Sequence, residues 1–367
     1  MKALLHLRRG PAARLFISAL LASLAVAGRA QTVEVDEMRK QAENGLAEAQ
    51  NTLGLMYKSG TGLTQDFAQS LKWFQKSAEQ GYPAAQKNLG LLYAEGKGVQ
   101  PDLNEAVKWF RKAADQNFAS AQTYLAMLSF EGKVPMPDLA EAVKWLRKAA
   151  EGNYAEAQDD LGWVYLEGKG VPQDVNEAVT WFHKAADRNF ASAQDHLGNL
   201  FLDGKGVPQD YAQALDHYRK AANQNYAASQ STLGWMYSEG KGVERDDAEA
   251  VKWFRKAADQ DYTSAQNQLG MMYEQGRGVS RDYPKAAEWY RRAAERGYGG
   301  AQNNLAIAYA LGQGVPKDLI EASKWFALGA AHGDNQRAEL REAIKKDMTP
   351  AQIAEAEKRV KEFKPGK

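Results

Sequence analysis

Apolar side chains recur along this chain with the spacing of amphipathic helices. In the first clear example, Ala49, Leu53, Met56 and Tyr57 stand at positions i, i+4, i+7 and i+8, which places them on one face of a helix. A second apolar stripe of helical period begins at Leu71, after a short segment rich in glycine. The pattern therefore predicts two helices in succession, joined by a turn.

This pair of helices recurs with a period of 36 residues. A glutamine that follows a small residue marks every copy, and a leucine stands three positions after it. The glutamines are Gln50, Gln86, Gln122, Gln158, Gln194, Gln230, Gln266 and Gln302. Because a single pair cannot bury both of its faces, we expect neighbouring pairs to stack. The predicted fold is all-α, an α-α superhelix (solenoid) of about eight 36-residue helix-turn-helix repeats.

Glycine and aspartate mark the boundaries of the predicted helices. Gly60 and Gly62 supply positions where a positive φ costs little, so the first helix is expected to end there. An aspartate precedes the second helix in every copy, as expected of an N-cap. The aspartates are Asp66, Asp102, Asp138, Asp174, Asp210, Asp246, Asp282 and Asp318. In seven copies Glu or Gln follows three residues later, which is the spacing of a capping box.

The N-terminus has the pattern of an export signal. Basic residues up to Arg14 precede an apolar run over residues 15–26, and small residues then suit cleavage after Ala27 or Ala30. We therefore expect a signal peptide over residues 1–30, a periplasmic or secreted protein, and no stable membrane span after cleavage. A buried N-terminal helix is the alternative interpretation. The choice between the general and the twin-arginine export route stays open.

The segments that flank the repeats are expected to cap the stack. Residues 31–46 resemble a lone second helix and form the predicted N-terminal capping helix, ahead of the repeats over residues 47–334. Residues 335–367 form the predicted C-terminal capping helices, the last of which starts at Thr349–Pro350. Such caps are needed because an outermost repeat has no neighbour to cover it.

Charge and composition exclude several classes of function. The first thirty residues hold five basic groups and no acidic one, so the remaining chain has 42 basic against 46 acidic residues and a net charge near −4. This balance argues against a nucleic-acid partner. The chain contains no cysteine, which excludes disulfides, thiolate metal sites and a cysteine nucleophile.

The repeated pattern Ala-Gln-x-x-Leu-Gly-x-x-Tyr-x-x-Gly-x-Gly-Val-x-x-Asp, continued by Glu-Ala-x-x-Trp-Phe-x-x-Ala-Ala, resembles the Sel-one-like repeat, a relative of the tetratricopeptide repeat. The resemblance covers about residues 47–334 and implies an adaptor or scaffold for protein complexes. Exported bacterial members are linked to envelope regulation, secretion or host contact. A cysteine-rich branch is associated with β-lactam binding or hydrolysis, and the absence of cysteine argues against a hydrolase of that branch here. The third copy departs from the pattern at Ser129 and Val134–Pro135, so its hairpin is expected at a slightly different angle.

No motif predicts catalysis, a cofactor or a metal. The Glu-Gly-Lys-Gly segments, such as residues 95–98, lack the spacing and the preceding strand of a phosphate-binding loop, so we interpret them as turns. His183, His196, His217 and His332 have no i, i+4 partner, so metal binding is not expected. The tryptophan that closes the pattern in seven copies is expected to pack in the core.

A candidate binding surface comes from the fifth residue after each glutamine, here named the strip. On an ideal helix this position lies about 160° from the centre of the apolar stripe, yet it is apolar in seven copies. The strip consists of Leu55, Leu91, Met127, Trp163, Asn199, Trp235, Met271 and Ile307. One interpretation is that a neighbouring first helix covers it. The other is a partner-binding surface on the concave face of the superhelix, which the irregular sizes of the residues favour.

Acidic residues near Trp163 add polar chemistry to the strip. Glu156, Asp159 and Asp160 are expected to rim this indole, which suits a peptide with apolar and basic residues, unless they form a solvated face. Exposed tryptophans beside Asn and Asp would also stack on sugar rings. The sequence therefore favours a non-catalytic exported scaffold for protein or peptide partners. A glycan- or peptidoglycan-binding envelope protein is the alternative.

Overall fold

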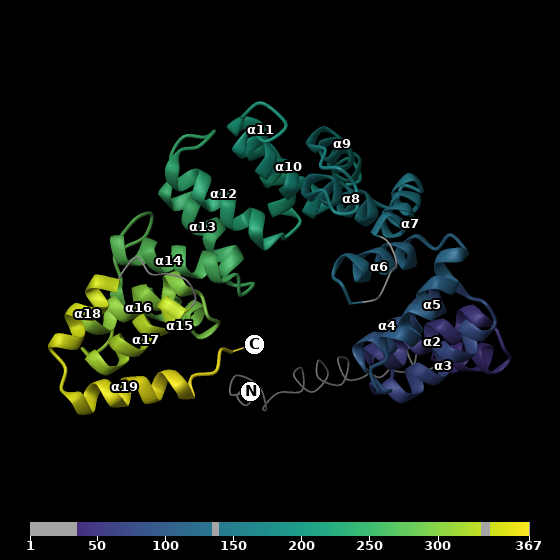
Figure 1. Ribbon diagram of the computed structural model, residues 1–367, viewed down its shortest axis with the longest axis horizontal. Coiled ribbons are helices and arrows are strands. Elements are labelled where there is room, and N and C mark those ends of the chain that lie inside the picture. The colour runs from purple at the N-terminus through teal and green to yellow at the C-terminus, as the bar shows by residue number, and fades with distance from the viewer. Residues whose placement is uncertain (1–34, 134–138, 332–337, 367) are drawn as a thin grey trace, which may run out of the picture. The chain divides into compact units, whose positions relative to one another are not determined.

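The computed structural model describes residues 35–133, 139–331 and 338–366, and within them every regular element is a helix (Figure 1). The predicted signal peptide lies outside these residues. The chain divides into two compact units, up to Asp174 and from Val175 onward, which are described separately. In the described part of the chain, no helix has the length and apolar character needed to cross a bilayer.

The first unit is a stack of helix pairs. A helix over residues 35–43 precedes them. The others are α2 (Ala47–Ser59), α3 (Phe67–Glu79), α4 (Pro83–Glu95), α5 (Leu103–Asp115), α6 (Ala119–Phe130), α7 (Leu139–Glu151) and α8 (Ala155–Glu167). From α2 to α8, successive helices pack against each other, so the pairs follow one another as repeats (Figure 1).

The second unit continues the same arrangement. Its helices are α9 (Val175–Ala186), α10 (Ala191–Asp203), α11 (Tyr211–Asn223), α12 (Ala227–Glu239), α13 (Asp247–Ala258), α14 (Thr263–Gln275), α15 (Tyr283–Glu295), α16 (Gly299–Leu311), α17 (Leu319–Ala331), α18 (Ala338–Lys346) and α19 (Pro350–Glu362). From α9 to α17, successive helices pack against each other. The predicted all-α architecture of stacked helix pairs is therefore confirmed within each unit.

Small residues let the two helices of a pair approach closely. A Cβ atom built on Gly54 of α2 would lie 2.6 Å from Cδ1 of Phe74 in α3. The same construction on Gly270 of α14 would bring the Cβ atom within 2.5 Å of Cε1 of Tyr290 in α15. Both rings are fully buried and fill the space that a larger side chain would need. Glycine is therefore required here by packing.

The backbone geometry confirms the predicted turns. Gly60 ends α2 with φ 76°, and Gly62 follows with φ 72°. The second helices from α3 to α15 are followed by a left-handed Gly, Asn or Asp, such as Asn117 with φ 63°. In the third copy Gly132 keeps a positive φ of 66°, whereas Val134–Pro135 lies outside the described residues. These are conformations that Gly and Asn adopt at low cost.

The structure confirms six of the aspartate N-caps and corrects the expected capping boxes. The aspartates whose carboxylates accept a backbone N–H of the first helical turn are Asp66, Asp102, Asp210, Asp246, Asp282 and Asp318. At these six aspartates the expected return bond to the third helical residue is replaced, because the backbone N–H donates to a carbonyl oxygen of the preceding helix, as that of Asp102 does to Tyr93 over 2.9 Å. The carboxylate of Glu105 accepts from Lys108 in an i, i+3 ion pair. Both bonds of a capping box are present at Thr349, with Gln352.

The glutamine that marks each copy joins consecutive repeats. Nε2 of Gln50 donates to the carbonyl oxygen of Ala42 over 3.0 Å, at the end of the preceding helix. Its Oε1 accepts from Gln80 over 2.6 Å. Gln86 repeats the first bond to Ala78. These buried amides satisfy carbonyl groups that a helix end leaves without partners, which explains why the residue recurs.

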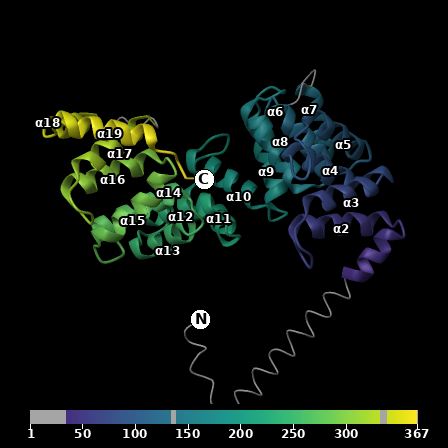
Figure 2. The same ribbon diagram turned by 90° about the horizontal axis from the view of Figure 1, so that it is seen from below.

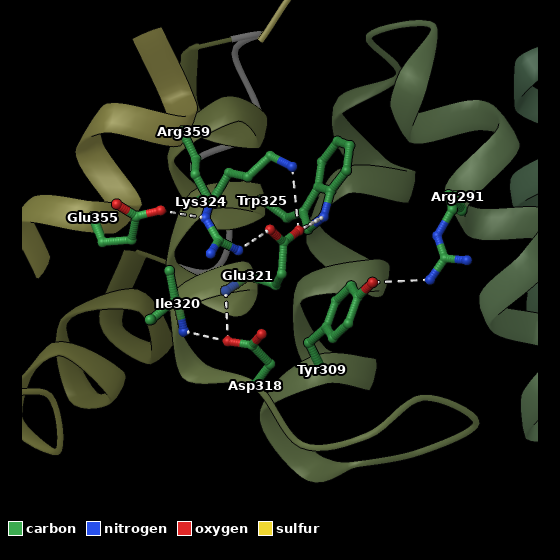
Figure 3. Close-up of polar contacts among 9 residues, drawn as sticks. All are labelled: Arg291, Tyr309, Asp318, Ile320, Glu321, Lys324, Trp325, Glu355 and Arg359. Carbon is green, nitrogen blue, oxygen red and sulfur yellow. Dashed lines mark hydrogen bonds and ion pairs between the residues drawn. The ribbon is translucent and has the colours of Figure 1, made fainter. Parts of the chain in front are cut away.

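The C-terminal helices cover the last repeat of the second unit, and α18 and α19 lie beside α17 (Figures 1 and 2). Arg359 of α19 donates to the carboxylates of Glu321 and Glu355 over 2.7 and 2.9 Å. Figure 3 shows that Glu321 also accepts the indole N–H of Trp325. The ring of Phe363 meets the Trp325 ring edge-on, with centroids 5.4 Å apart. The cap thus shields the outermost tryptophan of the stack.

Candidate partner-binding surface

The strip lies on the first helix of each copy, and its residues are at least partly exposed. Leu55 is 42% exposed, and Asn199 is exposed as well. The other six are half-buried: Leu91, Met127, Trp163, Trp235, Met271 and Ile307. Neighbouring helices therefore cover part of these six side chains, and the remaining surface is accessible to a partner.

Two strip residues of the first unit line a recess of about 520 Å³. Leu91 of α4 and Met127 of α6 contribute to it, together with the stacked rings of Phe110 and Tyr124, whose centroids are 5.7 Å apart. The rest of its lining is Ala94, Glu95, Pro101, Leu103, Leu128, Glu131 and Lys133. We name it the Leu91 recess. Most of these side chains are apolar, so the recess can receive an apolar group.

The charged residues of the Leu91 recess already have partners. Nζ of Lys97 lies 2.8 Å from the carboxylate of Glu95, and Nζ of Lys133 lies 2.7 Å from that of Glu131. Tyr124 is 37% exposed, and burial together with nearby carboxylates raises its pKa. Exposed ion pairs such as Lys97–Glu95 and Lys133–Glu131 contribute little to stability. A partner can therefore displace either lysine at small cost.

The three acids expected around Trp163 stand in different surroundings. Asp159 is 5% exposed, which contradicts the alternative of a solvated face for this residue. Glu156 is half-buried and accepts a hydrogen bond of 2.6 Å from the hydroxyl of Tyr154. Burial and this bond raise the pKa of Tyr154 to about 12. Asp160 is half-buried.

A lysine covers the indole of Trp163. Nζ of Lys169 lies 4.1 Å from the ring centroid. The corresponding lysine of the sixth copy, Lys241, lies instead over Tyr211 at 5.3 Å. Tyr211 is the first residue of α11, the second helix of the copy before Lys241. The equivalent residue in the copy before Lys169 is Leu139, whose aliphatic side chain cannot attract a cation. Lys241 therefore does not cover the strip tryptophan of its own copy.

Asn199 interrupts the apolar strip and takes part in a polar network. Its Nδ2 donates to Asp195 over 3.0 Å, and its Oδ1 accepts from Tyr218 over 2.7 Å. Asp195 also accepts from Ser229 of the next copy over 2.5 Å. Burial and the charge of Asp195 raise the pKa of Tyr218. The amide of Asn199 is thus held by residues that join two repeats.

Trp235 forms a wall shared by two recesses of the second unit. The larger has a volume of about 350 Å³ and is also lined by Leu202, Ser231, Thr232, Tyr262, Ser264 and Gln268. The smaller has a volume of about 140 Å³ and is also lined by Ser238, Glu239, Phe254, Gln268, Met271, Met272, Gln275 and Arg277. We name them the Tyr262 recess and the Arg277 recess. Two further strip residues, Trp235 and Met271, thus border depressions of the surface.

Sequence reasoning missed an acidic residue that accompanies the strip. The ninth residue after the glutamine is acidic in five successive copies and exposed in each. These residues are Glu95, Glu131, Glu167, Asp203 and Glu239. Positions i and i+4 share a helix face, so each acid lies beside the strip residue of its own helix, as Glu95 does beside Leu91. Its recurrence at the repeat period is the signal that identifies it.

The structure brings together two histidines that lie 34 positions apart in the sequence. The rings of His183 and His217 have centroids 6.0 Å apart, and Phe201 stacks on His217 at 5.5 Å. In most other copies the position of His183 holds arginine, that of Phe201 holds tyrosine and that of His217 holds tryptophan. His332 lies outside the described residues. Within the described ranges, no group of three or more His, Asp or Glu side chains is placed to hold a metal ion.

The tryptophan series packs in the core, as predicted. Trp73, Trp181, Trp289 and Trp325 are buried, and the other three are half-buried. A cation from the same helix covers most of these rings. Nζ of Lys184, for example, lies 3.6 Å from the centroid of Trp181. These rings therefore belong to the framework that holds the strip in place.

Comparison with known proteins supports the repeat assignment. The family model described as Sel1 repeat matches residues 47–82, 83–118, 119–154, 155–190, 191–226, 227–262, 263–298 and 300–334. The chain is similar to a Sel1 repeat protein from Oxalobacter formigenes, with 32% identity over 85% of this chain and 91% of that chain and a TM-score of 0.63. It is also similar to a protective antigen of uropathogenic Escherichia coli strains that displays an SLR fold, with 31% identity over 90% of this chain and 78% of that chain and a TM-score of 0.49. A search of curated proteins finds no significant match.

Proposed function

The chain belongs to the Sel1 repeat family, and from its recessed strip we propose that it is a non-catalytic scaffold or adaptor that binds protein or peptide partners. Repeat stacks of this kind present long surfaces built from many similar helices. The strip supplies such a surface in each unit. Its side chains differ in size from copy to copy, as a surface fitted to a particular partner requires.

The observation that carries this proposal is the coincidence of the strip with the Leu91 recess. Leu91 and Met127 are half-buried and line a mostly apolar depression of about 520 Å³, which lies within the usual range of about 300–1,000 Å³ for ligand sites. The stacking of the repeats accounts for the buried leucine of each copy but not for this apolar opening. A partner that inserts an apolar side chain would remove it from water.

The chemistry of the recess supports a partner with an apolar anchor beside a basic residue. The anchor would contact Leu91 and Met127, and the neighbouring cation would replace Lys97 or Lys133 at the carboxylates of Glu95 or Glu131. Most of the binding free energy would come from the apolar anchor, because buried apolar anchors dominate such interfaces and exposed charges contribute little.

We place this protein in the periplasm or outside the cell. The support is the charged, apolar and small-residue order of residues 1–30, which is typical of a cleaved export signal. A partner would then belong to the cell envelope or to the surroundings of the cell.

A capture experiment with matched variants tests the partner-binding role. The tagged chain is used to isolate partners from envelope extract, and binding is then measured for the double variant Leu91→Ala, Met127→Ala. We expect a loss of about 2 kcal/mol or more in binding free energy. The control is Lys72→Ala, an exposed change on the second helix α3, which should bind as the unchanged chain does. If the double variant retains a native melting curve and full partner binding, the Leu91 recess is not the binding site.

A further inference from the structure

The Tyr262 recess differs in chemistry from the other two recesses on the strip. None of the residues that line it carries a charge at neutral pH. The Leu91 recess contains two glutamates and a lysine, and the Arg277 recess contains a glutamate and an arginine. The Tyr262 recess therefore has no counter-charge to offer an ionic ligand.

Two aromatic rings form walls of the Tyr262 recess. Trp235 of α12 is half-buried, and Tyr262, the N-cap residue of α14, is 37% exposed. The loop lysine that covers the strip tryptophan of the fourth copy is turned away here, because Lys241 lies over Tyr211. An aromatic face left open in this way attracts the C–H groups of a flat ligand through its negative π-cloud.

Hydroxyl and amide groups complete the lining. Ser231 is only 8% exposed, and neither it nor Ser264 nor Gln268 forms a side-chain hydrogen bond to any other described residue. Thr232 donates to the carbonyl oxygen of Ala228 over 3.2 Å, which leaves its oxygen free to accept. The hydroxyl of Ser231 lines the recess and is not sealed from solvent, so a ligand in the recess can form a hydrogen bond with it. These groups together can donate and accept hydrogen bonds at several points.

From this arrangement we infer that the Tyr262 recess binds a neutral saccharide, in addition to any protein partner of the strip. A sugar ring has C–H faces that stack on Trp235 and Tyr262, and a rim of hydroxyls that both donate and accept. Those hydroxyls match Ser231, Ser264 and Gln268. The volume of about 350 Å³ is at the small end of the range for ligand sites and suits a short saccharide.

A proline-rich peptide is the principal competing ligand, because such peptides also dock between aromatic side chains. Proline has no backbone N–H. A proline-rich segment would therefore leave the acceptor oxygens of Ser231 and Gln268 without donors. The unpaired side chains of the recess favour the saccharide.

Titration of the purified full chain with chitotetraose, cellotetraose and maltotetraose tests the inference, with calorimetry and tryptophan fluorescence as readouts. We expect at least one of them to bind with a dissociation constant of about 1 mM or tighter. Trp235→Ala should weaken that binding about tenfold or more, and Ser231→Ala with Gln268→Ala should weaken it several-fold. Trp235→Tyr keeps an aromatic face, so it should retain most of the affinity for the saccharide. This variant distinguishes loss of the aromatic contact from a folding defect.

Trp163→Ala is the matched control, because it removes a tryptophan from the same repeat position in the first unit. Its affinity for the saccharide should equal that of the unchanged chain. The inference is wrong if none of the three saccharides binds, or if Trp163→Ala weakens binding as much as Trp235→Ala does. It is also wrong if octaproline binds in a Trp235-dependent way and the saccharides do not. Partner capture through Leu91 and Met127 is measured separately, so either idea can fail without the other.

Discussion

Arg359 of the last helix and Glu321 of α17 are joined by a hydrogen bond of 2.7 Å between Nη1 and Oε1. The two residues are 38 positions apart, and Glu321 at the same time accepts from the indole of Trp325 (Figure 3). One carboxylate therefore orients the outermost tryptophan and attaches the helix that covers it. The stability of the last repeat should depend on this contact.

Loss of the Arg359 contact should destabilise the second unit. We expect Arg359→Ala to lower the free energy of unfolding by about 1 kcal/mol, because its ion pair is only partly exposed to solvent. Removing residues 349–367 should lower it further, since Trp325 would then face water. Lys358→Ala is the control: its Nζ lies 4.0 Å from Glu362, and both side chains are 64% exposed. Urea denaturation gives the comparison, and equal midpoints for the two point variants would show that the cap does not depend on Arg359.

The close approach of α12 and α13 predicts a cost for a single methyl group. A Cβ atom on Gly234 would lie 2.8 Å from Cδ1 of Phe254, so Gly234→Ala should force the ring to shift. We expect a loss of about 1–2 kcal/mol in unfolding free energy. The eighth copy combines Ala306 with Phe326, which indicates that such a ring can be displaced and keeps the expected cost moderate.

A second substitution checks this packing explanation. The third copy combines Ala126 with Leu146, so Phe254→Leu in the Gly234→Ala background should restore part of the lost stability. Thermal unfolding of the single and double variants measures the coupling. If the two changes are simply additive, the glycine does not act through the ring of Phe254.

The stability of the second unit should fall at mildly acidic pH because of His217. Burial, Lys220 and His183 lower the pKa of this imidazole, and the opposing effects of Asp216 and Asp187 are smaller. The unfolded chain therefore binds a proton near the ordinary value of about 6.5, before the folded chain does. Stability should be complete above that pH and should fall as the pH decreases toward the folded-state pKa, by at most about 1.4 kcal/mol per pH unit.

His217→Trp should remove this pH dependence, because tryptophan occupies the position in the other seven copies. The urea midpoint of each protein is measured between pH 7.5 and 5.0. The unchanged chain should lose more stability over this range than the variant. Parallel curves would mean that His217 does not titrate in the way its surroundings predict.

Export should yield a shortened protein. We expect the chain recovered from the periplasm or medium to begin at Gly28 or Gln31, where small residues follow the apolar run. Leu20→Arg should keep the full-length chain inside the cell, because a charge interrupts that run. The double variant Arg8→Lys, Arg9→Lys should block export only if the chain uses the twin-arginine route. N-terminal sequencing of each fraction gives the answer, and an uncleaved cytosolic chain would contradict the proposed location.

The helices and their boundaries follow from the sequence because their signals are local. Gly60 ends a helix through its own φ, and Asp102 caps one through a bond to a residue three positions away. The eight-fold recurrence of such signals also makes stacking the predictable way to bury the apolar stripes. The capping boxes were mispredicted because the backbone N–H of each cap, such as Asp102, donates to a carbonyl oxygen of the preceding helix, such as that of Tyr93, which lies outside the motif.

The candidate site depends on contacts between residues about one repeat apart, which the sequence does not specify. Lys169 and Lys241 hold the same position in two copies, yet one covers Trp163 and the other lies over Tyr211. Burial of Asp159 is likewise set by the helices around it. By itself the sequence determined the repeat, the helix ends and the position of the strip. Only the tertiary structure decided which strip residues border a recess and with what polar groups, because neighbouring repeats supply the walls.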